Sequence, residues 1–478
     1  MTKYPEWVLK FREKGTAIHF LKGKYYLYKI SSKWDAEKKR SKKITEKFLG
    51  TITPEGLVLP KTERIKQHFN NISVKEYGAS NYLYSIHNDI INALKITFPN
   101  AWQELFLCAF FRLLYKSPIK NLDFHYQNSY LSELLPKTKM NDKHISQIFK
   151  EVGIERSKIV EFFKQFVTPN EFLLIDTTHI NSLSRKIIKT KVGYNSKRNF
   201  NPQMNAMFIF SVKRKQPVYY RLLSGNIREI KAMKLSIQES GLEKAVIISD
   251  KGFYSKANKE NLEKEELKYI IPLRRSSSLI DYSIIKQQDN KKYDGYFIYH
   301  QRIIWHHTIK NEKDKTVIFI DNELKINEDK DYLLRIENQR AGYNKEKFFE
   351  NQHKFGTISI ITNLMENSAE EVYKYYKSRC EIETLFDTFK NVLDADRTYM
   401  QSDEQVETWM FVNYLALMFY YNCYNLLLEN KLLTKYSTSD ILLFLSEIKK
   451  LKIDKTWYLS EVSNKYKELF KKLNITIT

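Results

Sequence analysis

Residues 376–390 read Tyr-Lys-Ser-Arg-Cys-Glu-Ile-Glu-Thr-Leu-Phe-Asp-Thr-Phe-Lys, and the rest of the chain can be interpreted around them. In an α-helix, which turns about 100° per residue, Arg379, Glu383 and Lys390 fall at about 300°, 340° and 320° from Tyr376. One narrow stripe would then carry a phenol, a guanidinium, a carboxylate and an ammonium. Most such stripes are solvated faces joined by salt bridges. A functional stripe needs partners elsewhere in the sequence.

Two upstream aspartates are candidate partners. Asp176 follows the run Phe-Leu-Leu-Ile, and Asp250 follows Ala-Val-Ile-Ile-Ser. Short, branched apolar runs of this kind are typical of strands buried on both faces in an α/β protein. A carboxylate at such a place is costly unless it is paired or binds a metal. Each aspartate alone could also be an ordinary helix cap.

Together these residues resemble a known family. Asp176, Asp250 and Glu383 look like the three acids of the DDE transposases of bacterial insertion sequences. The stripe matches the Tyr-x2-Arg-x3-Glu-x6-Lys signature of the insertion-sequence-four group. The resemblance covers about residues 165–430. It includes three further short motifs: Ser-Gly-Asn at 224–226, Asp-Lys-Gly-Phe-Tyr at 250–254 and Ile-Thr-Asn at 361–363.

The resemblance implies a chemistry for each residue. Asp176, Asp250 and Glu383 would hold two Mg²⁺ ions, for which Mn²⁺ can substitute, beside the phosphate to be cut. Arg379 offers a bidentate fork and Lys390 a point charge to phosphate oxygens, and Tyr376 can donate one hydrogen bond.

The implied activity is that of a cut-and-paste DNA transposase. It would bind terminal inverted repeats and target DNA as double strands, cleave, and transfer the strand by a DDE two-metal mechanism. Family members act as homodimers on paired ends. Two alternatives stay open: a domesticated or inactive DNA-binding relative, and a ribonuclease-H-like nuclease that cuts without joining.

The expected fold class is α/β. The N-terminal region is expected to be mixed, first β and then α-helical. It is followed by a catalytic core that resembles the ribonuclease-H-like fold and is interrupted by a β-rich insertion. The C-terminus is expected to be helical. The expected parts are a β-rich N-terminal module (1–70), a helical DNA-binding region (71–165), the first part of the core (166–275), the insertion (276–355), the second part of the core with a helix over 369–393 (356–430), and the C-terminal region (431–478). Apolar residues three and four apart predict helices over 82–94 and 102–115. In the first part of the core, the pattern predicts three strands, a helix, a strand, a helix and a strand.

Basic stretches outside the stripe are candidate contacts with the DNA backbone. We expect the run Lys38, Lys39, Arg40, Lys42 and Lys43 to contact phosphate, although a solvated loop fits it as well. The same two interpretations apply to residues 181–203, which include Arg185 and Lys186.

The insertion contains one candidate for base stacking and one histidine cluster. Trp305 can stack on an unpaired base, although a tryptophan at that place is more often part of a core. His306 and His307 are adjacent on a predicted strand and so point to opposite faces, which argues against a metal cluster that would include His300. His179, close to Asp176, is more easily explained by a structural role.

Composition agrees with a nucleic-acid partner. The chain of 478 residues has a formal net charge of +23 and a pI near 9.4, which points to a polyanion. Three scattered cysteines suggest neither a disulfide framework nor zinc. The most apolar stretch, 409–428, is broken by asparagines and is expected to be a buried helix rather than a membrane span. We expect a cytoplasmic, nucleoid-associated protein of a bacterial or archaeal host.

Overall fold

The structure is a computed structural model of the whole chain. It describes residues 4–35, 39–64, 72–166, 172–192, 201–225, 230–241, 246–249, 251, 253–287 and 289–477. Two of the expected site residues, Asp250 and Lys38, lie outside the described residues. The chain divides into two compact units, one formed by residues 1–77, 448–462 and 478 and the other by 78–447 and 463–477.

The first unit begins with a small antiparallel sheet. Lys22 and Gly23, both with positive φ, make the tight turn between its first two strands, as the Lys-Gly-Lys break predicts. Val8, Ile18, Leu27 and Ile52 form the core of this sheet. Its elements are α1 (Glu6–Leu9), β1 (Thr16–Leu21), β2 (Lys24–Asp35), β3 (Arg40–Thr53) and β4 (Gly56–Val58), in the sheet order β1-β2-β3-β4.

A three-stranded sheet in the same unit joins distant parts of the chain. Strand β16 (Lys449–Ile453) pairs with β17 (Thr456–Leu459) and with β5 (Ile72–Glu76), antiparallel in both cases. The region after residue 430 is therefore mixed rather than only helical. Besides the strands β16 and β17, it holds the helices α18 (Thr438–Ser446) and α19 (Asn464–Lys472). Strands β16 and β17 form a hairpin, and a turn at Asp454 and Lys455 joins them. Short runs of alternating pattern on both sides of such a turn are typical of a hairpin.

The second unit begins with a helical region, as expected. The predicted helix over 102–115 is confirmed as α5, and Asn141 accepts a hydrogen bond from the His144 amide as the N-cap of α8. The expected helix over 82–94 is instead two helices that break at the buried His87. The helices are α3 (Gly78–Ile86), α4 (Asn88–Thr97), α5 (Trp102–Tyr115), α6 (Leu122–Asn128), α7 (Leu131–Leu134), α8 (Asp142–Ile154) and α9 (Arg156–Lys164).

The next elements follow the predicted order of three strands, helix, strand, helix and strand, with one short extra strand. In the sheet order, β6 and β9 flank β8 with antiparallel pairing, and β10 pairs in parallel with β11. Strand β10 also lies beside β6. The elements are β6 (Leu173–Asn181), β7 (Lys191–Val192), β8 (Pro202–Ser211), β9 (Gln216–Ser224), α10 (Ile230–Ser240), β10 (Val246–Ile248), α11 (Lys256–Lys264) and β11 (Lys268–Pro272).

The insertion is mixed rather than predominantly β. Its strands β12, β13 and β14 pair in succession and join β15 and β11, which makes a six-stranded sheet with β10. The run after β14 carries a helical rather than an alternating pattern, and Asp321 caps it. The elements are α12 (Ser283–Lys286), β12 (Gly295–Tyr299), β13 (Arg302–Lys310), β14 (Lys315–Asp321), α13 (Asn322–Glu337), α14 (Lys345–Asn351) and β15 (Thr357–Thr362).

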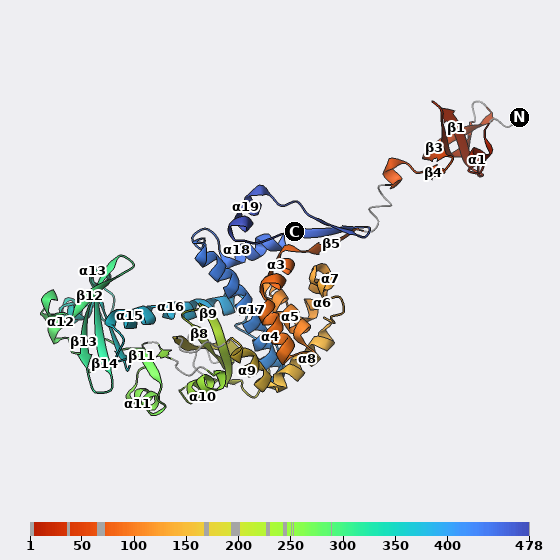
Figure 1. Cartoon of the computed structure of the whole chain (residues 1–478). Coiled ribbons are helices and arrows are strands. Elements are labelled where there is room, and N and C mark those ends of the chain that lie inside the picture. The colour runs from red at the N-terminus through yellow and green to blue at the C-terminus, as the bar shows by residue number, and fades with distance from the viewer. Residues whose placement is uncertain are drawn as a thin grey trace. The chain divides into compact units, whose positions relative to one another are not determined.

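The apolar stretch after the Glu383 segment is a buried helix, α17 (Asp403–Glu429), which packs against α5 and α8 (Figure 1). Two of its buried polar side chains have partners: Asn413 accepts a hydrogen bond from Arg112 Nε at 3.0 Å, and Glu407 pairs with Arg156 Nη1 at 2.7 Å. Such pairing lowers the cost of placing these polar residues in a core. Among the described residues, no helix is both long and apolar enough to span a bilayer.

The contact between α8 and α17 leaves no space at Gly153. A Cβ atom there would lie 1.9 Å from the carbonyl oxygen of Glu404, in the first turn of α17. We expect Gly153→Ala to lower the free energy of unfolding by about 1–3 kcal/mol through this overlap. Alanine alone would raise it by about 1 kcal/mol through helix propensity. Chemical denaturation followed by tryptophan fluorescence measures the sign.

Lys150→Ala, at an exposed position of the same helix, is the control and should change stability little. A Gly153→Ala protein as stable as the wild type would contradict the close approach of the two helices.

Candidate active site

Asp176 lies in the middle of β6, not at its end. Leu173, Leu174 and Ile175 before it are buried, and the strand continues to Asn181. The Asp176 side chain is 33% exposed, and its Oδ1 accepts the Thr177 amide hydrogen at 2.8 Å. Asp176 is therefore the first residue of β6 whose side chain reaches solvent, between the neighbouring strands β8 and β10.

The chain on either side of Asp250 belongs to the same region. Ser249 follows the buried strand β10 and donates its amide hydrogen to Ile270 O at 3.2 Å. Burial lowers the pKa of Lys377, and the positive charges of Arg302 and Lys251 lower it further against the attraction of Asp321. Lys251, directly after Asp250, is thus close enough to Lys377 for their charges to interact, and Lys377 belongs to the segment that carries the stripe.

That segment is three pieces rather than the single helix expected over 369–393. Helix α15 (Ala369–Lys377) begins with a capping box of Ser368 and Glu371 and ends before Ser378. Helix α16 (Arg379–Asp387) follows and contacts β6. The last piece is a π-helical turn, η4 (Thr388–Val392). Turns of this kind inside helices frequently occur at functional sites.

The π-helical turn changes the expected stripe. Lys390 lies within η4, where a wider turn replaces the 100° step on which its predicted place depended. The 100° step therefore does not give the angle between Lys390 and Glu383, and the place of Lys390 on the face of Glu383 stays a prediction; the residue is half-buried. Tyr376, in α15, is also half-buried.

Arg379 connects the two described acids. Its Nη1 lies 3.1 Å from Glu383 Oε1, and its Nη2 lies 3.9 Å from Asp176 Oδ2. The Arg379 side chain is 24% exposed and that of Glu383 is 57% exposed. Two carboxylates that are far apart in the sequence thus face two nitrogens of one guanidinium.

Several buried polar atoms in this region point to a missing partner. Within the described part of the chain, Arg379 Nε, Thr177 Oγ1 and Ser249 Oγ are buried and have no hydrogen-bond partner. Such groups are rare in folded proteins and are usually satisfied by a water, an ion or a ligand. No sequence pattern singles out Thr177 and Ser249, because a hydroxyl next to an acid is common.

The donor set suits a hard divalent cation. Carboxylate oxygens are the ligands that Mg²⁺ prefers, and it keeps several waters, so few protein ligands are needed. Asp176 and Glu383 could supply such oxygens from one side of Arg379. Among the residues that the structure describes, no group of three His, Cys, Asp or Glu side chains could hold a metal ion. A third carboxylate would have to come from Asp250.

Trp305 is half-buried in the insertion. It lies opposite Tyr296 in the pairing of β12 with β13, and their rings are 5.1 Å apart. The ring of Tyr293 lies 6.0 Å from the ring of Trp305. The tryptophan thus joins an aromatic cluster on the outer hairpin of the sheet, which fits neither a fully buried core residue nor an isolated exposed ring.

Three histidines of the insertion lie on strand β13 and in the turn before it. His307 Nδ1 lies 3.3 Å from Asp294 Oδ1, whereas His306, next to it on β13, belongs to the opposite face and contacts the ring of Phe297. His300 lies in the turn between β12 and β13. His179 is buried on β6, which agrees with a structural role.

The basic run of the first unit lies on a two-stranded arm. Lys39 has a positive φ at the turn, and Arg40, Lys42 and Lys43 follow on β3. Lys42 lies opposite Lys33 of β2, and the side chains of the arm are exposed on both faces. Trp34 on this arm is also exposed. Arg40, Lys42 and Lys43 are therefore part of a regular ribbon and not of a loop.

Comparisons with known proteins identify the family of the chain. The family described as Transposase DDE domain matches residues 168–419, which is more than half of the chain and includes all three acids. No curated protein matches. One similar solved structure is the piggyBac transposase synaptic complex with hairpin DNA, with 12% identity, a TM-score of 0.38, and coverage of 72% of this chain and 69% of that one.

The matched region begins just before β6 and ends within α17, so that it spans the elements that carry Asp176, Arg379 and Glu383, and it includes position 250 of the sequence. On the extent of this match, the chain belongs to the transposase DDE domain family.

Proposed function

We propose that the protein is a DNA transposase of an insertion sequence in the insertion-sequence-four group. It binds the terminal inverted repeats of its element, cleaves the DNA with Mg²⁺ as cofactor, and joins the liberated end to target DNA. The observation that carries this proposal is the approach of Asp176 and Glu383 to a common guanidinium, Arg379.

The order of the strands supports a ribonuclease-H-like core. Three antiparallel strands, β6, β8 and β9, come first; β10 then lies beside β6, and β11 runs parallel to β10. This arrangement puts Asp176 and the end of β10 on neighbouring strands. Helix α16 brings Glu383 to the same place.

Each residue has a defined task in the proposed reaction. Asp176, Asp250 and Glu383 hold two Mg²⁺ ions, which when bound favour deprotonation of the attacking oxygen and neutralise charge on the phosphate. Arg379, Lys390 and Tyr376 orient the phosphate at the element end. Water first frees a 3′-hydroxyl, which then attacks the opposite strand or the target DNA.

Arg379 suits a change of partner. Ion pairs of partly exposed side chains contribute only about 0.2–1 kcal/mol. Once cations neutralise the two carboxylates, the guanidinium loses little by turning to a phosphate oxygen, which it can bind bidentately. When no DNA is bound, the positive charge of Arg379 offsets the repulsion between the Asp176 and Glu383 carboxylates.

The first prediction concerns the acids. Asp176→Asn, Asp250→Asn and Glu383→Gln should each lower the rate of DNA cleavage at least about a thousandfold, since they remove several kcal/mol of charge stabilisation. DNA containing the element ends should still bind, and melting temperature should change little, because Asp176 and Glu383 are partly exposed. Cleavage of labelled end DNA in Mg²⁺ measures the effect.

Glu381→Gln, two residues before Glu383, is the matched control and should cleave at the normal rate. Full activity of Glu383→Gln would sink the assignment. Cleavage by the wild type without any joined product would favour the nuclease alternative.

The second prediction concerns Lys390. Lys390→Ala should weaken binding of DNA that carries the cut end by about tenfold, because a phosphate contact near the terminus is lost, while internal repeat DNA binds as before. Fluorescence anisotropy with the two DNA fragments separates these effects. Equal weakening on both fragments would rule out a contact at the terminus.

The third prediction concerns the arm. Replacing Lys39, Arg40, Lys42 and Lys43 by alanine should weaken DNA binding and reduce the slope of log K against log salt by up to about 3.6, at about 0.9 per phosphate contact. Two-stranded ribbons fit the major groove, which is why this arm is the proposed contact.

The control replaces four exposed lysines elsewhere in the same unit, Lys10, Lys14, Lys24 and Lys61. If both variants lose the same amount of affinity, overall charge and not the arm governs binding.

A further inference from the structure

Two adjoining cavities of the second unit are not explained by the site above. One has a volume of about 710 Å³ and the other about 550 Å³, and both are lined by Tyr399 and Gln401. The loop that carries these residues is a polar run between two helices and has no distinctive sequence pattern. We call the two adjoining cavities together the groove.

The fold ties the larger cavity directly to the active-site elements. Its walls come from residues 181–186, which leave β6 after Asp176, and from 396–399, which follow the Glu383 segment. The Asn181 amide donates to Asp396 O at 2.9 Å, and the Thr398 amide donates to Asn181 O at 3.0 Å. This parallel β-bridge between Asn181 and Arg397 holds the loop that lines the groove against the end of β6.

The larger cavity is positively charged. Arg185, Lys186 and Arg397 line it against a single acid, Asp396, which lies 3.4 Å from Arg397 Nε. The Arg397 side chain is 76% exposed and so is available to a ligand. Serine hydroxyls and asparagine amides are also part of the lining: Ser182, Ser184, Asn181 and Asn201. Cations with neutral hydrogen-bond donors are the chemistry that binds phosphodiesters.

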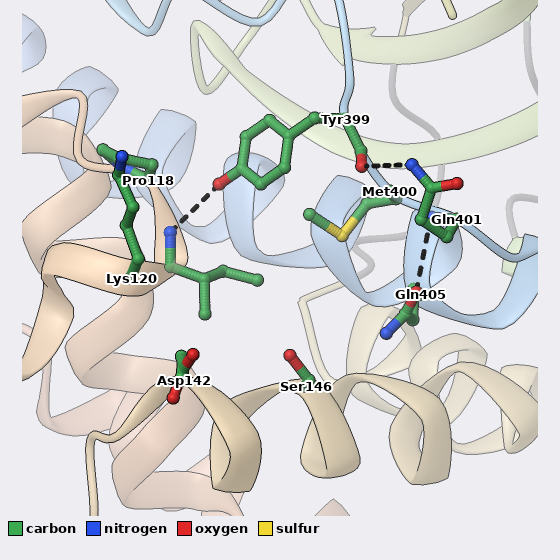
Figure 2. A pocket seen from close by; sticks show the side chains of 9 residues that line it. Pro118, Lys120, Asp142, Ser146, Tyr399, Met400, Gln401 and Gln405 are labelled. Carbon is green, nitrogen blue, oxygen red and sulfur yellow. Dashed lines mark hydrogen bonds between the residues drawn. The ribbon is translucent and has the colours of Figure 1, made fainter. Parts of the chain in front are cut away.

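The smaller cavity is more apolar. Figure 2 shows Tyr399, Pro118 and Met400 around it, with Asp142 and Ser146 of α8 facing them across the space. The Tyr399 hydroxyl accepts the Ile119 amide hydrogen at 3.0 Å, which fixes the ring. A fixed aromatic ring beside apolar walls suits sugars and base faces.

The distance from the active site can be estimated from the strand. Asn181 lies five residues after Asp176 on β6, which is about 17 Å at about 3.3 Å per residue. This span equals about five base-pair steps of duplex DNA at 3.4 Å each.

We propose that this groove binds the backbone of a DNA strand about five base pairs from the scissile phosphate. Arg185, Lys186 and Arg397 contact its phosphates, and the Tyr399 side of the groove takes the adjoining sugar and base. The proposal rests on the proposed function and adds to it a second DNA contact, on the elements that carry Asp176 and Glu383.

The test is a triple variant, Arg185→Ala, Lys186→Ala and Arg397→Ala, with the wild-type acids. These side chains are exposed, so folding should be kept, which melting temperature checks. We expect at least tenfold weaker binding of end DNA and a salt slope reduced by up to about 2.7. Hydroxyl-radical footprinting should show lost protection about five base pairs from the cut.

The control removes three exposed lysines of α19, Lys467, Lys471 and Lys472. Two shortened DNA fragments show which part of the DNA the groove binds, one shortened on the element side and one on the flanking side. The fragment that lacks the part bound by the groove should bind the triple variant and the wild type with equal affinity.

A triple variant with the affinity, salt slope and footprint of the control would overturn the groove proposal while wild-type cleavage still supports the proposed function. Failure of the wild type to cleave end DNA in Mg²⁺ would instead overturn the proposed function itself.

Discussion

The contact of Arg379 with Asp176 and Glu383 is the interaction on which the organisation of the site depends. Asp176 belongs to a sheet strand, and Glu383 belongs to a helix that follows a long insertion. Without a cation between them, the two carboxylates would repel each other. The guanidinium supplies the opposite charge at both atoms, and the weak energy of partly exposed ion pairs leaves it able to release them.

Helix α17 gives this arrangement its rigid support. It lies against α5 and α8, and its buried Glu407 pairs with Arg156, whose Nη2 also donates to Tyr220 O at 2.7 Å. Removing one partner of a buried pair is costly, since it leaves an uncompensated charge. The polar groups of this helix thus fix how the helical region meets the strand β9, and the loop that lines the groove enters α17 directly.

The sequence could predict elements whose pattern is local. The helix over 102–115 and the strand order after residue 172 follow from apolar periodicity, and both are confirmed. It could not predict the π-helical turn at 388–392, because a helical pattern has no feature that marks one extra residue in a turn. Nor could it predict the pairing of β16 with β5, which joins opposite ends of the chain.

The same limit applies to the site. Asp176 and Glu383 were expected together, and Arg379 was placed on the same face, but its role between the two acids needs coordinates. The insertion was expected to be β-rich because its aromatic strands alternate clearly, whereas α13 has a weak apolar face and no buried residues. Arg185 and Lys186 of the groove lie in a basic stretch that the sequence marks as a candidate DNA contact, whereas the loop at 396–401 has no such pattern and its residues gain meaning only when the fold brings them beside 181–186.

The central claim is that Asp176, Asp250 and Glu383 hold divalent cations together. Titration of the DNA-bound protein with Mn²⁺, followed by electron paramagnetic resonance, tests it most directly. The account predicts two ions bound per site in the wild type and loss of at least one in each of Asp176→Asn, Asp250→Asn and Glu383→Gln, with the fold unchanged. Equal Mn²⁺ binding by the wild type and all three variants would contradict it.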